Sequence, residues 1–438
     1  MKPTGGIPPS RAAIRAGQWE RLRSLLGTLR PGNRFYARTL AALGDPAGLS
    51  GLAEFSARVP FTTKAEVVAD QLAAPPYGTN LSFPPTAYTR CHQTSGTTGI
   101  PLRWLDTPQS WDWMVANWVQ IYEAAGVRPG AKVFFAFSFG PFIGFWLAFE
   151  AAARLGALCL PGGGLSSAAR LRMILDHGAT VLCCTPTYAL HLAEVARAEH
   201  FDLAQSPVRT LIVAGEPGGS LPATRARLEH LWPKVRVFDH HGMTEVGPVS
   251  HECPACPGVL HLLEAGYYAE VINPATGAPV PAGTTGELVL TTLGRVGSPL
   301  LRYRTGDLVK AVQDPADEAA PPCRCGRHAL ALAGGILGRV DDMIIVRGVN
   351  VFPTAVEDVI RRFPEIAEYQ VKITHTDGLP EMTVRIEPAA GGEPNGLGQR
   401  LQQAFQVAFS LRVPVVAVPP GTLPRFELKA RRWLKTGA

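Results

Sequence analysis

Between Thr94 and Gly99 the chain has the sequence TSGTTG, which brings four hydroxyl side chains and two glycines together. Glycine costs about 1 kcal/mol inside a helix, and Ser and Thr compete for backbone hydrogen bonds, so the stretch predicts a loop. The N–H groups and hydroxyls of such a loop suit phosphate oxygens, while a plain surface turn is the alternative. Ile100 follows the last glycine, which argues against a P-loop. The candidate phosphate-binding residues are Thr94, Ser95, Gly96, Thr97, Thr98 and Gly99.

Four of the eight cysteines lie in two short motifs, CPAC at Cys253 and Cys256 and CRC at Cys323 and Cys325, and His261 lies between them in the sequence. Thiolates and imidazoles from two loops are the usual ligands of a structural Zn²⁺. We therefore expect four of these five residues to bind zinc, and the alternative is a set of independent thiols. The sequence leaves open whether His261 or Cys256 completes the site.

Three further motifs follow the hydroxyl-rich loop: DHHGMTEVGP at 239–248, RYRTGDL at 302–308 and GRVDDMIIVRGVNVFP at 338–353. In this order and spacing they resemble the adenylate-forming (acyl-CoA synthetase) superfamily. The segments FTTKAEV before the loop, GEPGG at 215–219 and RGVNVFPTAVEDVI make the chain most similar to the phenylacetate-CoA ligase family. The resemblance covers nearly the whole chain.

This resemblance implies an enzyme that uses ATP and Mg²⁺ to convert a carboxylic acid to an acyl-adenylate, and then forms a thioester with coenzyme A. Delivery of the acyl group to a carrier-protein thiol or to an amine is the alternative. A nucleotide-binding protein without catalysis is a third reading, and the joint presence of the motif residues argues against it.

The resemblance also implies roles for single residues. Thr244 would contact the α-phosphate, Glu245 would hold Mg²⁺, and Lys429 in the terminal PRFELKARRWLK would reach the forming acyl-phosphate bond. Asp307 would accept the ribose hydroxyls, Arg339 would be a second nucleotide contact, and Asp341 would be the hinge between domains. The residues expected to line the nucleotide are Gly215, Glu216, Pro217, Asp239, His240, His241, Gly242 and Met243.

Two positions depart from the family pattern. His241 stands where an aromatic Tyr commonly precedes the glycine, and an imidazole that becomes charged at low pH would weaken purine stacking. Many relatives also carry a Lys in or after the loop, whereas the nearest cation here is Arg103. We expect Arg103→Ala to lower activity weakly and Lys429→Ala to lower adenylation strongly.

The acid-binding pocket is expected in FSFGPFIGF at 137–145, where a strand ends and the next helix begins. An apolar cleft lined by aromatic rings suits an aromatic or otherwise hydrophobic carboxylic acid, and plain core packing is the alternative. The candidate pocket residues are Phe139, Gly140, Phe142 and Ile143.

These residues require an α/β scaffold. Strand-like runs at 131–138, 157–160, 179–183, 208–213 and 235–238 alternate with helix-like runs such as 166–176 and 188–200. Such alternation predicts a mostly parallel sheet covered by helices, with sites at the carboxyl ends of the strands. The uncharged run at 133–149 is interrupted by Ser, Gly and Pro, so we expect a buried strand, a turn and a helix rather than a membrane span.

The sequence pattern changes after about residue 258. Short β-prone pieces between turn residues at 258–312 predict an antiparallel β subdomain. From about residue 339, helix, strand, strand and helix patterns predict a small α+β domain, and the resemblance implies that this domain is mobile. We therefore expect two domains, residues 1–338 and 339–438.

Composition limits the partners. A net charge of +6 over 438 residues, with acidic residues interspersed, does not indicate nucleic acid or a membrane surface. The start MKPTGGIPPSRAAIR lacks an apolar run, so we expect a cytoplasmic protein. The expected partners are a small-molecule carboxylic acid and coenzyme A or a carrier-protein pantetheine, and a homodimer is left open.

Overall fold

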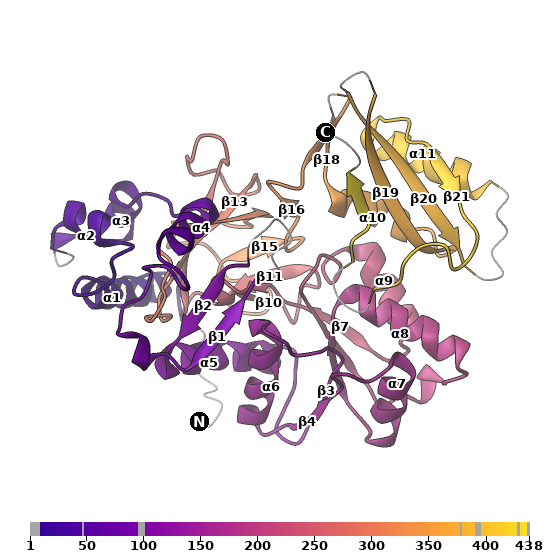
Figure 1. The fold of residues 1–438 in the computed structure, drawn as a ribbon, viewed down its shortest axis with the longest axis horizontal. Helices are drawn as coiled ribbons and strands as arrows, with labels where there is room; N and C mark the ends of the chain where they lie inside the picture. Colours follow the sequence, from indigo (N-terminus) through magenta and orange to yellow (C-terminus); the bar gives the residue numbers. More distant parts are fainter. Residues whose placement is uncertain are drawn as a thin grey trace. The chain divides into compact units, whose positions relative to one another are not determined.

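The computed structural model describes residues 9–45, 48–94, 101–347, 349–376, 379–389, 396–426 and 430–435, and Figure 1 labels their helices and strands. The chain forms two compact units. Unit 1 comprises residues 1–163 and 239–336, and unit 2 comprises residues 164–238 and 337–438. The expected division into domains 1–338 and 339–438 stays a prediction.

Unit 1 begins with helices that share one apolar core. Their bounds are Arg11–Leu29 (α1), Ala37–Leu43 (α2), Leu52–Arg58 (α3) and Lys64–Ala73 (α4). Leucines of α1, α2 and α3 pack with Tyr268, Leu293 and Leu301 of the later chain. The β-strands Arg90–Gln93 (β1) and Arg103–Asp106 (β2) then pair antiparallel, with Gln93 opposite Arg103. The predicted loop therefore connects the two strands of a hairpin.

The run at 133–149 is a strand, a turn and a helix, as expected. Strand Lys132–Phe135 (β3) pairs parallel with Leu158–Pro161 (β4), and helix Ile143–Leu155 (α6) connects them. Helix Pro108–Ala124 (α5) packs on α6. Its N-cap is Thr107, whose hydroxyl accepts the Ser110 N–H, and Pro108 is its first residue. Within the described residues, no helix combines the length and apolar composition needed to cross a membrane.

The rest of unit 1 is antiparallel, as predicted for the β subdomain. The strands are Gly242–Met243 (β8), Gly247–Pro248 (β9), Ser250–Glu252 (β10), Val259–Leu262 (β11), Tyr267–Ile272 (β12), Thr285–Thr292 (β13), Tyr303–Lys310 (β14) and Ala331–Ala333 (β15). Strand β11 pairs with β10 and β15, and β13 pairs with β12 and β14. The short β8 and β9 form a hairpin of their own.

Unit 2 starts with the remaining α/β elements. They are Ser167–Asp176 (α7), Val181–Cys184 (β5), Pro186–Ala198 (α8), Thr210–Val213 (β6), Pro222–Leu231 (α9) and Arg236–Asp239 (β7). Strands β5 and β6 pair parallel, and β7 follows β6 in the strand order. Helices α7, α8 and α9 lie side by side (Figure 1). The alternating strand and helix patterns are thus confirmed, with β5 buried along its whole length.

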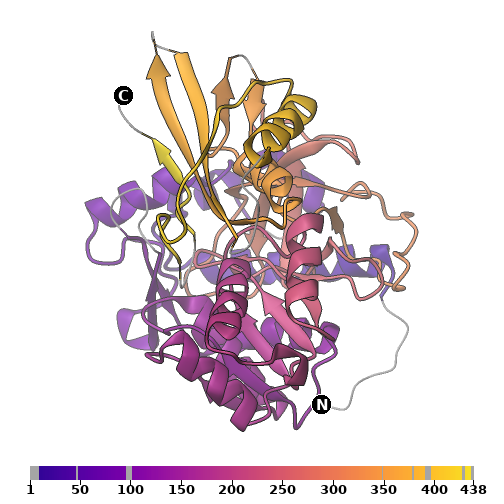
Figure 2. The ribbon, with the colours of Figure 1, turned by 90° about the vertical axis from the view of Figure 1, so that its right-hand side faces the viewer.

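The last hundred residues add an α+β layer to unit 2. Their elements are Gly338–Arg339 (β16), Ile344–Val346 (β17), Val349–Val351 (β18), Pro353–Arg361 (α10), Ile366–Thr376 (β19), Leu379–Pro388 (β20), Leu397–Phe409 (α11), Val415–Ala417 (β21) and Trp433–Lys435 (β22). One sheet has the order β21-β20-β19-β22. Figure 2 shows the long β19–β20 pair with α11 beside it. The apolar faces of α10 and α11 cover this sheet.

Candidate functional site

Thr94 closes the hairpin that carries the hydroxyl-rich loop. Its N–H donates to the Leu102 carbonyl at 2.9 Å, and its Oγ1 accepts the Leu102 N–H at 3.0 Å. The other loop candidates lie outside the described residues; they are Ser95, Gly96, Thr97, Thr98 and Gly99. Arg103, the nearest cation, donates from Nη1 to the Pro76 carbonyl at 3.0 Å. Its guanidinium is thus held by the backbone of an adjacent turn.

Asp307 and His241, predicted to contact ribose and adenine, meet in unit 1. Asp307 lies in β14 with 4% of its surface exposed, and its Oδ2 is 3.0 Å from His241 Nε2. The two residues are 66 positions apart in the sequence. Neighbouring His240 packs edge-on against Trp118, and burial lowers the pKa of its imidazole to about 3. This environment keeps His240 neutral near pH 7.

The turn that carries Thr244 and Glu245 joins β8 to β9 in unit 1, and Arg295 binds its backbone carbonyls. Arg295 Nη1 donates to the Thr244 carbonyl at 2.6 Å and to the Glu245 carbonyl at 2.9 Å. The same guanidinium donates twice to Asp106, at 2.7 and 2.6 Å, and both side chains are fully buried. This bidentate pair fixes the backbone of the two predicted phosphate and Mg²⁺ ligands.

Glu245 also faces a cation that the motif analysis did not assign. Lys64, the first residue of α4, places Nζ 3.4 Å from Glu245 Oε1. Lys64 belongs to the FTTKAEV segment, so its motif was visible in the sequence, but nothing local pointed to Glu245. Arg295 and Asp106 gave no sequence signal, because they lie in unremarkable segments and meet only through the fold.

The predicted acid pocket contains a cluster of aromatic rings in unit 1. The rings of Phe137 and Phe145 stack at 4.1 Å between centroids, and Phe142 lies edge-on to Phe145 at 6.0 Å. Phe139 contacts the Trp146 ring at 4.9 Å, while Ile143 is buried at the start of α6. Gly140 has a φ of 49°, a conformation that favours glycine in this turn.

Glu216, predicted to line the adenine, makes two backbone contacts in unit 2. Its Oε1 accepts the Thr187 N–H at 2.8 Å and its Oε2 accepts the Ala430 N–H at 2.9 Å. Burial raises the pKa of this carboxyl, against the opposing effects of Arg432 and the hydrogen bonds. The neighbouring Gly215 and Pro217 are exposed.

Arg339 and Asp341 pair with each other in unit 2. Arg339 Nε donates to Asp341 Oδ1 at 2.9 Å, and the Asp341 carboxylate is largely exposed. Lys429 lies outside the described residues, and Ala430 is the next residue in the chain.

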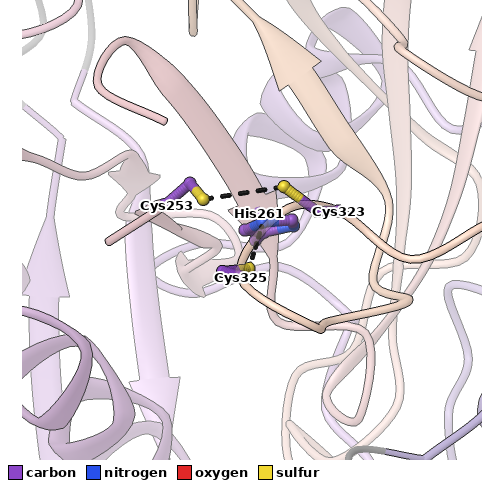
Figure 3. A group of neighbouring side chains, drawn as sticks. All are labelled: Cys253, His261, Cys323 and Cys325. Atoms are coloured by element: carbon purple, nitrogen blue, oxygen red, sulfur yellow. Dashed lines mark hydrogen bonds between the residues drawn. The ribbon is translucent and has the colours of Figure 1, made fainter. Parts of the chain in front are cut away.

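Cys253, His261, Cys323 and Cys325 form one cluster in unit 1, drawn in Figure 3. Their ligand atoms all lie within 4.8 Å of one another. The sulfur atoms of Cys253 and Cys323 are 3.7 Å apart, and Cys325 Sγ is 3.3 Å from His261 Nε2. Tetrahedral zinc with ordinary bond lengths separates two sulfurs by about 3.8 Å, and a sulfur from a nitrogen by about 3.6 Å. The four atoms therefore have the spacing that a zinc ion needs.

The surroundings of the cluster also suit a metal. His261 Nδ1 donates to the Ala329 carbonyl at 3.2 Å, which leaves the Nε2 lone pair directed at the cluster. Burial raises the pKa of the Cys253 thiol to about 12, so a cation is needed to hold it as thiolate near pH 7. Cys256 lies beside the group, with Sγ 4.0 Å from Cys323 Sγ, but outside the set of four.

Comparisons with known proteins agree with the motifs. The AMP-binding enzyme family model matches residues 91–294, and the AMP-binding enzyme C-terminal domain model matches residues 348–436. Phenylacetate-coenzyme A ligase of Thermus thermophilus is 32% identical over 439 residues, with 95% of each chain covered. The protein of the same name from Escherichia coli is 30% identical over 437 residues, covering 96% of this chain and 94% of that one.

The chain belongs to the phenylacetate-coenzyme A ligase family of adenylate-forming enzymes. A crystal structure of 2-hydroxyisobutyryl-CoA ligase in the postadenylation state has the same fold as this phenylacetate-CoA ligase family member. It matches with a TM-score of 0.90 and 28% identity, covering 99% of this chain and 94% of that chain. The predicted family and the predicted α/β fold class are therefore confirmed.

Proposed function

We propose that this enzyme condenses a carboxylic acid with ATP to give an acyl-adenylate and pyrophosphate, and then transfers the acyl group to the thiol of coenzyme A. The observation that carries the proposal is the 32% identity to a phenylacetate-coenzyme A ligase along 95% of both chains. The grouping of Asp307 with His241, and of Glu245 with the Arg295-held turn, supports it within unit 1.

Different residues of the chain have different roles in adenylation. The carboxylate of Asp307, a buried residue of β14, accepts the two ribose hydroxyls in charge-assisted hydrogen bonds. Thr244 donates to the α-phosphate, and the backbone and hydroxyls of residues 94–99 bind the leaving pyrophosphate. Lys429 stabilises the charge that develops between the carboxylate and the α-phosphate. Gly215 and Pro217, together with Asp239 to Met243, border the adenine.

Mg²⁺ suits the carboxylate of Glu245, since hard cations prefer oxygen ligands. When bound, the ion offsets the negative charge of the phosphates. Glu245 is 6% exposed and its backbone is fixed by Arg295, so its carboxylate is preorganised as a ligand.

We also propose that residues 339–438 act as a small domain that turns about Asp341 between the two half-reactions. The exposure of the Asp341 carboxylate and the separate family match to residues 348–436 support this division. Such a rearrangement is a conformational step that precedes thiol transfer.

The acid is proposed to be aromatic or otherwise hydrophobic. The ring cluster around Phe137, Phe139 and Phe145 supports this class, because aromatic walls favour apolar acyl groups. The relatives' own acids differ, since one is named for phenylacetate and another for 2-hydroxyisobutyrate.

The test is acid-dependent pyrophosphate release over a panel of aryl, aliphatic and amino acids, with and without coenzyme A. We expect release with hydrophobic acids, and thioester formation when coenzyme A is present. Adenylate that accumulates with coenzyme A but is consumed by a carrier protein or an amine would instead support the alternative acceptor. Lys429→Ala should abolish most acid-dependent ATP–pyrophosphate exchange, whereas Arg103→Ala should lower it weakly.

Structural zinc is the second part of the proposal, with Cys253, His261, Cys323 and Cys325 as its ligands. Four ligands with tetrahedral spacing leave no open position, which supports a structural rather than a catalytic ion. It would join the loop after β10 to the segment before β15.

Metal analysis of purified variants tests this site. We expect about one zinc per wild-type chain, none in Cys323→Ser, and an unchanged content in the matched Cys256→Ser control. A wild-type chain without zinc, or loss of zinc in Cys256→Ser alone, would contradict the assignment.

A cytoplasmic location is proposed as well, and the eight free thiols support it.

A further inference from the structure

We propose that Glu216 is a positioning residue, which holds the chain segment next to Lys429 in place for adenylation. This inference rests on the proposed function, because it gives Glu216 a task in the first half-reaction only. It differs from the role expected from the sequence, in which the GEPGG segment borders adenine.

The carboxylate of Glu216 connects two backbone groups of unit 2. One oxygen accepts the N–H of Thr187 at 2.8 Å, and the other accepts the N–H of Ala430 at 2.9 Å. Thr187 lies in the first turn of α8, where backbone N–H groups have no partner inside the helix. Both contacts are with donors, so they require a group that accepts at both oxygens, which an ionised carboxylate does.

Thr187 also receives a second bond from the terminal segment. Arg432 Nη1 donates to the Thr187 hydroxyl at 3.2 Å, and the Arg432 side chain is 5% exposed. Arg432 is itself fixed by Glu368, to which it donates at 2.6 and 3.0 Å. Thr187 and Glu216 therefore bind the terminal segment at two residues, 430 and 432.

The terminal segment is also attached to its own sheet. The Val371 N–H of β19 donates to the Arg432 carbonyl at 2.8 Å, and β22 continues alongside β19 in parallel. The bonds at Thr187 and Glu216 thus connect this sheet to the start of α8.

The consequence for catalysis follows from the chain order. The Ala430 N–H belongs to the peptide bond between Lys429 and Ala430. The hydrogen bond to Glu216 therefore fixes the backbone at the residue next to the proposed catalytic lysine. An error of about 1 Å in the position of a reacting group can cost about a hundredfold in rate. Thiol transfer follows the adenylation step in which Lys429 acts, so it does not need the hydrogen bond between Glu216 and Ala430.

The experiment separates the two half-reactions in the full-length enzyme. The first is acid-dependent ATP–pyrophosphate exchange, and the second is thioester formation from supplied acyl-adenylate and coenzyme A. Glu216→Gln keeps the shape but turns one acceptor into a donor facing an N–H. We expect its exchange kcat to fall roughly 10- to 100-fold, as expected for a lost charge-assisted hydrogen bond, with the KM for ATP nearly unchanged. Thioester formation should stay within about twofold of wild type.

Two further variants guard the interpretation. Thr187→Val keeps the backbone N–H for Glu216 and removes only the Arg432 contact, so we expect a smaller, roughly 3- to 10-fold loss confined to exchange. Glu199→Gln makes the same chemical change at the exposed far end of α8 and should leave both half-reactions unchanged. Thermal melting of each variant checks that the fold is retained.

Several outcomes would overturn the inference. A raised KM for ATP with unchanged kcat would make Glu216 an adenine contact, and equal losses in both half-reactions would make it a general structural residue. A wild-type enzyme without acid-dependent exchange would contradict the proposed function and this inference with it. An active wild type whose Glu216→Gln variant exchanges at full rate would contradict the inference alone.

Discussion

Unit 1 and unit 2 each contain a buried arginine that pairs with a carboxylate near a predicted catalytic residue. The two arginines differ in the other groups to which they donate hydrogen bonds. In unit 1, Arg295 binds Asp106 and uses its remaining N–H groups on the carbonyls of Thr244 and Glu245. In unit 2, Arg432 binds Glu368 within one small sheet, and a single N–H reaches Thr187. The first pair fixes the backbone of two predicted site residues, whereas the second fixes a terminal segment that hydrogen-bonds to Thr187 of α8.

The two pairs differ in how completely they are buried and in what their arginines contact. The unit 1 pair is fully buried on both sides, so removing either partner leaves a charge without compensation. In unit 2, α9 packs on α10, and polar links to the C-terminal elements include the hydrogen bond from Arg227 Nη1 to the Ile366 carbonyl at 2.7 Å and the Glu194–Arg425 ion pair. Each such polar link contributes about 1 kcal/mol, so losing one costs less than losing either partner of the unit 1 pair.

The largest expected effect is at Asp106. Asp106→Ala leaves the Arg295 guanidinium buried without its carboxylate, and we expect the free energy of unfolding to fall by about 3 to 5 kcal/mol. Asp112→Ala provides the matched control, because Asp112 pairs with Arg154 at the surface and should cost at most about 1 kcal/mol. Urea denaturation measures both, and similar losses for the two variants would erase the contrast between buried and exposed pairs.

The next effect concerns nucleotide binding in unit 1. Asp307→Asn keeps the size of the side chain but removes the charge that the ribose hydroxyls would meet. We expect the KM for ATP to rise roughly 10- to 100-fold in the exchange assay, with little change in stability. An unchanged KM would separate the His241–Asp307 pair from the nucleotide site.

A pH effect of about 2 kcal/mol is expected from His92 in β1. Its ring is 5% exposed and stacks on Trp111 at 5.1 Å, and burial lowers its pKa to about 4. Below pH 6.5 this imidazole binds a proton in the unfolded chain, but in the folded chain it stays neutral until the pH approaches 4. The free energy of unfolding therefore falls as the pH falls, by about 2 kcal/mol at pH 5. His92→Gln should lose less stability between pH 7 and pH 5 than wild type does. His230→Gln, at an exposed position in α9, should behave as wild type.

The smallest effect is expected at the edge of the unit 2 contacts. Glu194 accepts from Arg425 Nε at 3.3 Å, and both side chains are more than a quarter exposed. We expect Glu194→Gln to change the free energy of unfolding by less than about 1 kcal/mol. A loss as large as that of Asp106→Ala would mean that the unit 2 contacts are as permanent as those of unit 1.

Much of the fold was accessible from local patterns. The interrupted apolar run at 133–149 predicted β3 and α6. The site was accessible only in part. Asp106 and Arg295 are 189 residues apart and belong to no motif, so no local pattern could connect them.

The sequence by itself determined the family, the order of strands and helices, and which residue types carry the chemistry, because periodicity and motif spacing are local properties. The tertiary structure decided which of these residues meet. It placed His261 rather than Cys256 in the set of four potential metal ligands, and it placed the two oxygens of Glu216 on the N–H groups of Thr187 and Ala430. The physical reason is that a side chain's partner depends on where distant strands and helices come together, which is settled by the packing of the whole chain.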